Sequence, residues 1–288
     1  MDISRFRVRP GEQVNLQKHD PADSEPFKDK KKAAKRLERG VNRLAELQSQ
    51  LYAQDRWSLL LIFQAMDAAG KDSVIKHVMS GLNPQGTQVF SFKRPSDEEL
   101  DHDYLWRTTR ALPERGRIGI FNRSYYEEVL VVRVHPEILD HQRIPKSLVT
   151  KKLWSERYED INAFERYLSR NGTVIRKFFL HVSKEEQKRR FLERLDDPSK
   201  NWKFSAGDVD ERGRWADYMH AYEQALSLTS TKHAPWFIVP ADRKWFTRLA
   251  VAEIVVDTLE RLDLSFPPAS QAHLDELVQA RKRLAAEP

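Results

Sequence analysis

Cysteine is absent from this chain of 288 residues. Disulfide bonds, iron–sulfur clusters, thiolate zinc sites and cysteine nucleophiles are therefore all excluded. Histidine does not replace them, because none of the nine histidines forms a zinc-binding pair of the His-Glu-x-x-His kind.

Long apolar runs are missing as well. The longest aliphatic-aromatic run is Leu59–Phe63, far short of the roughly 20 residues that cross a membrane. The first ten residues contain no apolar stretch like that of a signal peptide, and the mean hydropathy is −0.68. We therefore expect a cytoplasmic protein without a membrane partner.

Neither sign of charge dominates strongly. The chain has 49 Lys and Arg against 43 Asp and Glu, a net charge of +6, which favours anionic partners but does not indicate nucleic acid. Residues 28–43 carry eight basic and two acidic side chains. This stretch would either extend a track for a polyanion or form the solvated face of an amphipathic helix, and the second interpretation is favoured. Because aromatic and basic residues do not alternate here, we expect no nucleic-acid partner.

Short apolar runs alternate with segments of helical spacing along most of the chain, which predicts an α/β fold with a parallel five-stranded sheet flanked by helices. One domain is expected over residues 1–288, with an irregular arm over 1–27. Residues 195–214 interrupt the alternation and are predicted to form a mobile lid, within a lid module that spans 184–214. The predicted strands are Ser58–Gln64, Thr87–Phe92, Arg117–Phe121, Thr173–His181 and Trp236–Pro240. The predicted helices are Asp29–Gln54, Lys71–Ser80, Asp97–Thr109, Ser147–Arg170, Lys184–Leu195, Asp210–Ser227 and Arg243–Leu262.

A degenerate phosphate-binding loop follows the first predicted strand. Gly70 and Lys71 match the Gly-Lys of the Walker A pattern, while Ala65 replaces its first glycine and Asp72 its Ser or Thr. A helix N-terminus and a lysine still provide positive charge for a phosphate there. Asp67 and Asp72 are candidate Mg²⁺ ligands, directly or through water, in place of the missing hydroxyl. The alternative is an ordinary strand–turn–helix with a tight turn at Gly70.

Polar residues also follow the third predicted strand. Asn122 stands where related nucleotide-binding folds place a metal-binding carboxylate, and it offers only a carbonyl oxygen. Arg123 would point into the same crevice and clamp a phosphate. Glu127 lies close to that strand end. The alternative is a helix N-terminus with capping residues and first-turn glutamates, which does not explain Arg123.

The segment from Lys184 to Arg214 holds nine basic and eight acidic residues. By count alone, a solvated helix with ion pairs between neighbouring turns is favoured. The functional alternative is a lid whose lysines and arginines close over phosphates.

Together these pieces resemble the type 2 polyphosphate kinase family, over residues 65–262. The opening Phe6-Arg7-Val8-Arg9-Pro10 also resembles that family. The five stretches that carry the resemblance, in chain order, are residues 64–72, 103–107, 120–127, 198–204 and 234–240.

The resemblance implies a thymidylate-kinase-like phosphate-loop fold with a lid, and transfer of phosphoryl groups between inorganic polyphosphate and nucleotides with Mg²⁺, for which Mn²⁺ is an alternative. It implies purine nucleoside mono- or diphosphates as acceptors (AMP and ADP, or GMP and GDP) and a homo-oligomer. Asn122 stands where other members have aspartate. The site residues that it implies are Asp67, Gly70, Lys71 and Asp72 in the phosphate loop, Asn122, Arg123 and Glu127 after the third strand, and Lys200, Lys203, Arg212 and Arg214 in the lid.

A nucleotide phosphate is already anionic, so the transfer needs alignment and charge neutralisation rather than a strong base. We expect Asp67, Lys71 and Arg123 to carry it. Two rival hypotheses stay open at this point: an ATP-dependent nucleotide kinase on the same fold, and a non-catalytic module that binds polyanions through its basic helix.

Overall fold

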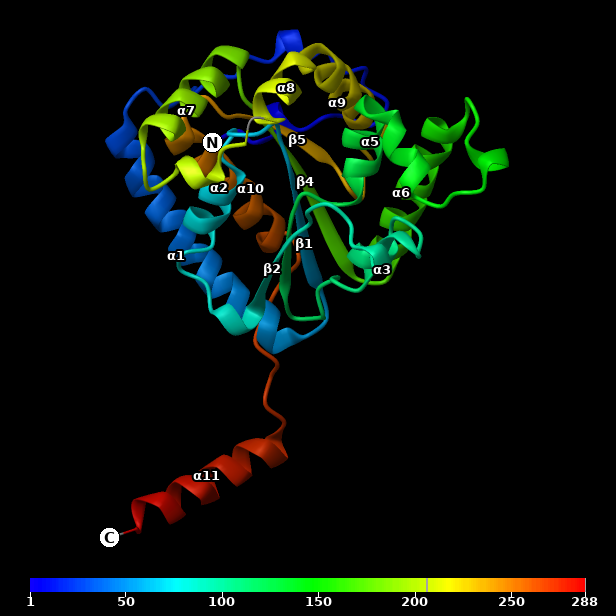
Figure 1. Cartoon of the computed structure of the whole chain (residues 1–288). Helices are drawn as coiled ribbons and strands as arrows, with labels where there is room; N and C mark the ends of the chain where they lie inside the picture. The colour runs from blue at the N-terminus through cyan, green and yellow to red at the C-terminus, as the bar shows by residue number, and fades with distance from the viewer. Residues whose placement is uncertain (206, 288) are drawn as a thin grey trace.

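Five parallel strands form the central sheet of the computed structural model, which describes residues 1–205 and 207–287 and all their side chains except that of Lys203 (Figure 1). The strands are β1 (Ser58–Gln64), β2 (Thr87–Ser91), β3 (Ile118–Asn122), β4 (Thr173–His181) and β5 (Trp236–Pro240). Their order is β2-β3-β1-β4-β5, so β1 lies at the centre and every residue of it is buried. Because all strands are parallel, their carboxyl ends meet at one edge of the sheet, where ligands bind in such folds.

Helices cover both faces of this sheet (Figure 1). One layer contains α1, α2 and α10, the other α5, α6 and α9, while α7 and α8 lie over the carboxyl edge of the strands. The bounds are α1 (Lys30–Gln54), α2 (Lys71–Val78), α3 (Asp97–Leu100), α4 (Trp106–Thr109), α5 (Val131–Val134), α6 (Leu153–Arg170), α7 (Lys184–Asp196), α8 (Gly207–Gly213), α9 (Trp215–Thr229), α10 (Lys244–Glu260) and α11 (Gln271–Ala285). The short 3₁₀ helices are Ser4–Phe6, Leu16–Lys18, Pro84–Gly86, Tyr125–Val129, Pro136–His141, Lys146–Leu148 and Asn201–Lys203.

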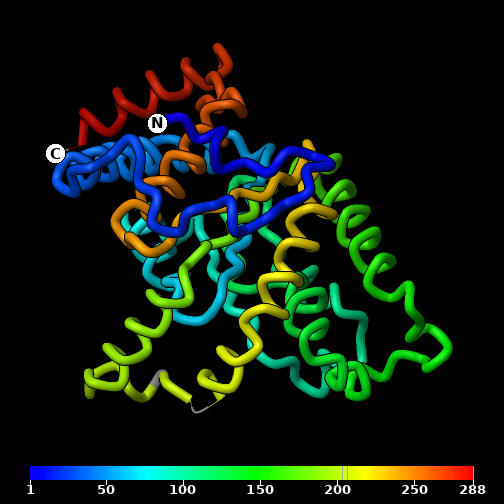
Figure 2. Tube along the Cα trace, turned by 90° about the horizontal axis from the view of Figure 1, so that it is seen from above, coloured from blue at the N-terminus to red at the C-terminus, as the bar shows by residue number. Residues whose placement is uncertain are grey.

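The N-terminal arm packs on the body of the protein, whereas the C-terminal helix does not. The N-terminal arm has little regular structure but packs on the body, where Phe6 and Leu16 are buried and Arg7 forms a β-bridge to Phe237 on the edge strand β5. Helix α11 instead stands apart from the body at the end of residues 261–270 (Figures 1 and 2). Its apolar side chains, such as Leu277, are about half exposed. No helix among the described residues has both the length and the apolar character needed to cross a membrane.

Three helix predictions are wrong in part. The helix expected over Asp97–Thr109 is two short helices, because the Asp103 side chain accepts from the backbone N–H of Leu105 (2.9 Å) and turns the chain between them. The helix expected from Asp210 is likewise two helices, divided after Gly213, and the helix expected from Ser147 begins at Leu153. Helix α11 was not predicted from the sequence.

His181, the last residue of β4, lies beneath the N-terminal arm and is 7% exposed. Burial, with a smaller contribution from His19, lowers the pKa of His181 to about 4, against an ordinary value of 6.5. The unfolded chain therefore takes up a proton near pH 6.5 that the folded chain accepts only near pH 4. Acid favours the unfolded state over this window by up to about 3 kcal/mol.

We predict that His181→Asn flattens the pH dependence of stability between pH 6.5 and 4, because the variant no longer binds this proton on unfolding. The measurement is the free energy of unfolding in urea across this range. The matched control is His273→Asn on exposed α11, which should follow the parent. Parallel curves for His181→Asn and the parent would contradict the assignment.

Candidate active site

The loop after β1 turns sharply before α2 begins. Ala68 and Gly70 both adopt left-handed backbone conformations, with φ of 60° and 106°. At Gly70 the conformation rather than space requires glycine, because an added Cβ would meet nothing closer than 3.8 Å. The turn places the positive N-terminal end of α2 at the carboxyl edge of the sheet.

Arg190 on α7 holds this loop in place. Its Nη1 donates to the carbonyl oxygens of Ala68 (3.0 Å) and Ala69 (2.8 Å). Its Nη2 donates to those of Ala241 (2.6 Å) and Asp242 (3.0 Å) after β5, and its Nε donates to Glu186 (2.7 Å). All five N–H groups of the guanidinium are thus used within the protein. Arg190 is therefore a positioning residue, and it has no donor left for a phosphate.

Unlike Arg190, Lys71 and Arg123 keep N–H groups that can donate to a phosphate. Among the described residues, Lys71 Nζ donates only to the Ala65 carbonyl oxygen (2.8 Å), which leaves two of its N–H groups for a ligand. Burial, and next the charge of Arg123, lower the pKa of Lys71. An anion between these two cations would relieve their repulsion.

Arg123 directly follows β3 with a φ of 66°, a strained conformation of the kind that collects at functional sites. Its backbone N–H donates to Phe63 on β1 (3.0 Å). Its Nη2 donates to Asp67 (3.0 Å), and its Nη1 lies 3.8 Å from Glu127. Glu127 is the main cause that raises the pKa of Arg123. The two carboxylates aim the guanidinium while part of it stays accessible.

A buried charge network anchors the segment after Arg123. The hydroxyls of Tyr125 and Tyr126 both donate to Glu165 on α6 (2.9 Å each). Lys177 on β4 donates to Glu165 (2.6 Å) and to the Tyr126 hydroxyl (2.8 Å). None of these side chains reaches solvent to any extent. Removal of one charge would leave the other uncompensated, so the network fixes this loop strongly.

Asp72 and Asp67 fit a role in holding Mg²⁺. Both line the cavity described below. Asp72 Oδ1 accepts from Asn122 (2.8 Å) and Asp67 Oδ1 from Arg123, so each carboxylate retains one oxygen. The described residues contain no preformed group of three metal-ligating side chains. The two free carboxylate oxygens are within what Mg²⁺ takes from a protein, since it commonly binds one or two carboxylates together with waters and substrate phosphates.

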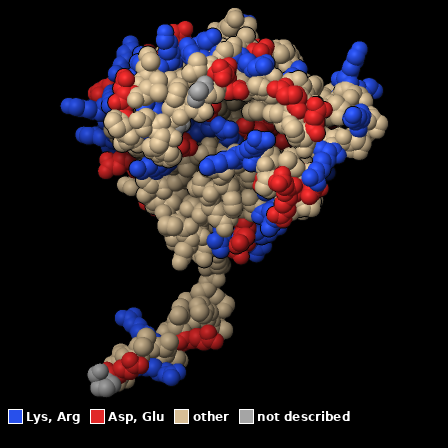
Figure 3. Space-filling view, in the orientation of Figure 1, with Lys and Arg blue, Asp and Glu red and all other residues tan. Residues whose placement is uncertain are grey.

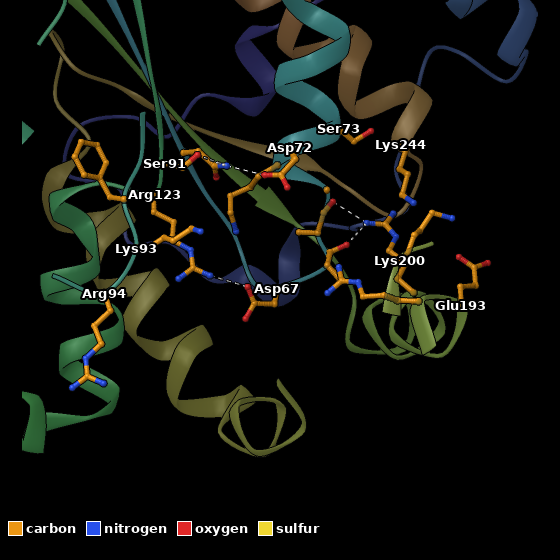
Figure 4. A pocket seen from close by; sticks show the side chains of 18 residues that line it. Asp67, Asp72, Ser73, Ser91, Lys93, Arg94, Arg123, Glu193, Lys200 and Lys244 are labelled. Atoms are coloured by element: carbon orange, nitrogen blue, oxygen red, sulfur yellow. Dashed lines mark hydrogen bonds and ion pairs between the residues drawn. The ribbon is translucent and has the colours of Figure 1, made fainter. Parts of the chain in front are cut away.

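A cavity of about 660 Å³ opens at the carboxyl edge of the sheet. The described part of its lining holds eight basic and three acidic side chains. Figure 3 shows Lys and Arg side chains (blue) gathered in this hollow. In Figure 4, Lys93, Arg94 and Arg123 lie on one side of Asp67, and Lys200, Glu193 and Lys244 on the other. The lining residues are Asp67, Ala68, Ala69, Gly70, Lys71, Asp72, Ser73, Ser91, Phe92, Lys93, Arg94, Asn122, Arg123, Arg190, Glu193, Arg194, Lys200 and Lys244.

The comparisons with known proteins agree with this arrangement. The family model described as polyphosphate kinase 2 matches residues 27–267. The chain belongs to the polyphosphate kinase 2 family. The predicted family, its phosphate-loop kinase fold and the enzyme class are thereby confirmed.

Three relatives cover almost the whole chain. The "ADP-polyphosphate phosphotransferase" of Rhodopseudomonas palustris is 56% identical over 282 residues, 97% of each chain. The "AMP/ADP-polyphosphate phosphotransferase" of Meiothermus ruber is 44% identical over 271 residues, 94% of this chain and 97% of the relative. The crystal structure of polyphosphate kinase 2 from Arthrobacter aurescens superposes with a TM-score of 0.86 at 42% identity, and covers 96% of this chain and 95% of that one.

The structure gathers most of the residues predicted for this polyphosphate kinase, but not all of them. Asp67, Gly70, Lys71, Asp72, Asn122, Arg123 and Lys200 line the cavity, and Glu127 adjoins it through Arg123. Arg212 and Arg214 do not line it. Arg212 instead donates to Gln187 (2.9 Å), which donates to the Asp67 backbone oxygen (3.0 Å). The side chain of Lys203 lies outside the described part of the structure.

Sequence reasoning missed several cationic residues of the cavity. Lys93 and Arg94 follow β2 as Arg123 follows β3, so the rule that parallel strand ends converge would have found them. Lys244 is the first residue of α10, which begins four residues after β5 ends. The convergence of parallel strand ends would have found Lys244 as well. Arg190 and Arg194 gave no such signal, because they sit among ion-paired residues on a charged helix.

We predict that Lys71→Ala and Arg123→Ala each lower turnover by about 10³-fold or more, since both cations face the transferred phosphoryl group. The melting temperatures should stay within about 3 °C of the parent, because neither side chain belongs to the core. Steady-state kinetics and calorimetry measure both. Lys188→Ala, on the exposed face of α7, is the control that should retain activity. Loss of folding in parallel with loss of activity would contradict the assignment.

We predict that Arg190→Lys lowers the melting temperature by about 5 °C or more, because an ammonium with three N–H groups cannot serve five acceptors. The control is Arg194→Lys. This cavity arginine lies 3.9 Å from Asp208 and 5.6 Å from the centre of the Phe191 ring, contacts that a lysine can keep, so the variant should unfold like the parent. Equal melting temperatures for Arg190→Lys and Arg194→Lys would show that the five-donor arrangement contributes nothing.

Proposed function

We propose that this polyphosphate kinase transfers a phosphoryl group from inorganic polyphosphate to a nucleoside mono- or diphosphate. Its relatives in Rhodopseudomonas palustris and Meiothermus ruber carry names that state ADP and AMP/ADP as the nucleotides, which supports adenine nucleotides as acceptors. The expected use of GMP and GDP, the homo-oligomer and the cytoplasmic location stay predictions.

One observation carries the choice of donor. The donor base of an ATP-dependent kinase needs an apolar slot beside the phosphate loop. Here the described lining contains a single aromatic residue, Phe92, which follows β2. The wall formed by α7, the segment after it and α10 instead presents Arg194, Lys200 and Lys244. Arg190 ties the phosphate loop to the loop after β5. This wall suits a donor that consists of phosphates only.

The residues of the cavity can perform the transfer without a general base. The acceptor oxygen is anionic at neutral pH, so the barrier lies in bringing two polyanions into line. Lys71 retains two N–H groups and Arg123 part of its guanidinium for the moving phosphoryl group, while Lys93 and Arg94 hold the acceptor side. When bound by Asp67 and Asp72, Mg²⁺ or Mn²⁺ would neutralise phosphate oxygens and hold them in register.

The decisive test incubates the purified chain with Mg²⁺ and ADP plus polyphosphate, without ATP, and in parallel with AMP plus ATP, without polyphosphate. ATP should form in the first reaction, and the second should be slow. Turnover with ATP as the only effective donor would establish the rival nucleotide kinase. Tight polyphosphate binding without any Mg²⁺-dependent turnover would establish the binding module.

We also predict that the KM for polyphosphate rises steeply between about 0.05 and 0.5 M salt, since a long polyanion on fixed cations is held by charge that salt screens. The kcat should change much less. Initial rates at saturating ADP measure both constants. A KM that stays flat over this range would contradict a donor site built from lysines and arginines.

A further inference from the structure

The exposed face of α1 carries a row of cations outside the phosphate cavity. It consists of Lys32, Lys35 and Arg39, called the α1 cation row below. Steps of three and four residues place these side chains on one face of the helix, over about 10 Å of its length. All three are exposed, and none of them forms a hydrogen bond or an ion pair with any described residue.

The two arginines on the same face of α1 are engaged by α10. Arg36 donates to Glu253 (2.8 and 2.6 Å), and Arg43 donates to Glu260 (3.0 Å). These contacts use the carboxylates that α10 brings to this face. No carboxylate of the described residues pairs with the α1 cation row, so the row presents its positive charge to a ligand.

A groove of about 490 Å³ runs beside the row. The described part of its lining holds four basic side chains and one acidic side chain, Glu253. Glu253 is already held by Arg36 and by the N-terminal ammonium group of Met1 (3.3 Å), so the groove attracts anions. Figure 3 shows Lys and Arg side chains (blue) at the upper left, over the N-terminal half of α1. The lining residues are Phe27, Lys32, Lys35, Arg36, Arg39, Gly40 and Glu253.

A short series of contacts connects this groove to the phosphate cavity. Helix α1 lies beside α10 (Figures 1 and 2), and Lys244, the first residue of α10, lines the phosphate cavity. The residue before it, Arg243, donates to the Ser24 hydroxyl. The backbone N–H of Phe27, which lines the groove, donates to the Ser24 carbonyl oxygen (2.7 Å). The groove therefore begins close to the wall of the cavity that contains Lys244.

The groove suits a ligand made of phosphates better than a nucleic acid. Single-stranded nucleic acids are held by aromatic side chains that stack on the bases, as well as by cations. The one aromatic residue in the described lining is Phe27, and the Arg36 guanidinium lies 5.7 Å from the centre of its ring. A row of cations without a free stacking surface fits a polyanion that carries no bases.

We propose that the α1 cation row is a second binding site for inorganic polyphosphate, and that it holds a distant part of the chain whose end lies in the phosphate cavity. The proposal rests on the proposed function, since it takes polyphosphate as the donor on the side of α10. A chain of many phosphates extends beyond the cavity, past Lys244. Once it is held at the row, its end stays at a high effective concentration in the cavity. Only long chains gain this advantage.

The test therefore compares chains of about 100 phosphates with tripolyphosphate, which is too short to occupy both sites. The triple variant Lys32→Gln, Lys35→Gln, Arg39→Gln keeps good helix formers on α1. It should raise the KM for the long chain about five- to ten-fold, because three exposed cations are lost. The kcat and the KM for tripolyphosphate should stay at the parent values.

The matched control removes the same charge elsewhere. The triple variant Arg281→Gln, Lys282→Gln, Arg283→Gln lies on exposed α11, which stands apart from the body, and it should behave like the parent. Both polyanions are also titrated by calorimetry into the parent and the two variants, with Mg²⁺ and without nucleotide. The α1 variant should bind the long chain about five- to ten-fold more weakly and should bind tripolyphosphate like the parent.

The proposal is overturned if the α1 and α11 variants bind the long chain equally well, or if the α1 variant loses affinity for both chain lengths to the same extent. It is also overturned if the α1 variant loses affinity for single-stranded RNA while its affinity for long polyphosphate is unchanged. Selective loss of long-chain binding in a protein without polyphosphate-dependent turnover would overturn the proposed function alone, because the titrations require no transfer.

Discussion

Repulsion between cations is the constraint that shapes this structure. Eight basic side chains share one cavity, and the charge of Arg123 helps to lower the pKa of Lys71. Before any anion binds, the protein must hold these groups close together by other contacts. Carboxylates hold Arg123 in place, and backbone carbonyl oxygens hold Lys71 and Arg190. The electrostatic repulsion between these cations is relieved when an anionic substrate binds between them, and this relief favours binding.

The cation cluster depends on contacts that lie well behind it. Arg123 has a strained backbone, and the residues next to it are fixed by two tyrosines on one buried carboxylate. That carboxylate is itself compensated by Lys177 of the sheet. The arginine at the cavity is thus connected to the core through a chain of short hydrogen bonds, which explains how a loop residue can be held as firmly as a strand residue.

Much of the fold could be predicted from the sequence, because apolar runs and helical spacing are local signals. β1, β4 and β5 have the predicted bounds, since each is a buried strand with polar or turn residues beside it. The break between α3 and α4 was missed because it depends on one side chain, Asp103, that competes for a backbone N–H. The phosphate loop and Arg123 were found because they directly follow strands. The role of Arg190 could not be predicted, since it depends on carbonyls about 50 and 120 residues away along the chain.

The saturation of Arg190 also limits how this enzyme can open. Helix α7 is fastened in its middle to both the phosphate loop and the loop after β5, so its N-terminal half belongs to the rigid body of the enzyme. Any opening over the cavity would therefore have to start beyond Arg190, towards the end of α7. Such a movement would carry Lys200, which lies after α7, whereas Lys71, Arg123 and Arg190 would stay in place. On substrate release, the bound phosphates would lose their contact with Lys200 first, while the cations of the phosphate loop and of the β3 end would keep their positions.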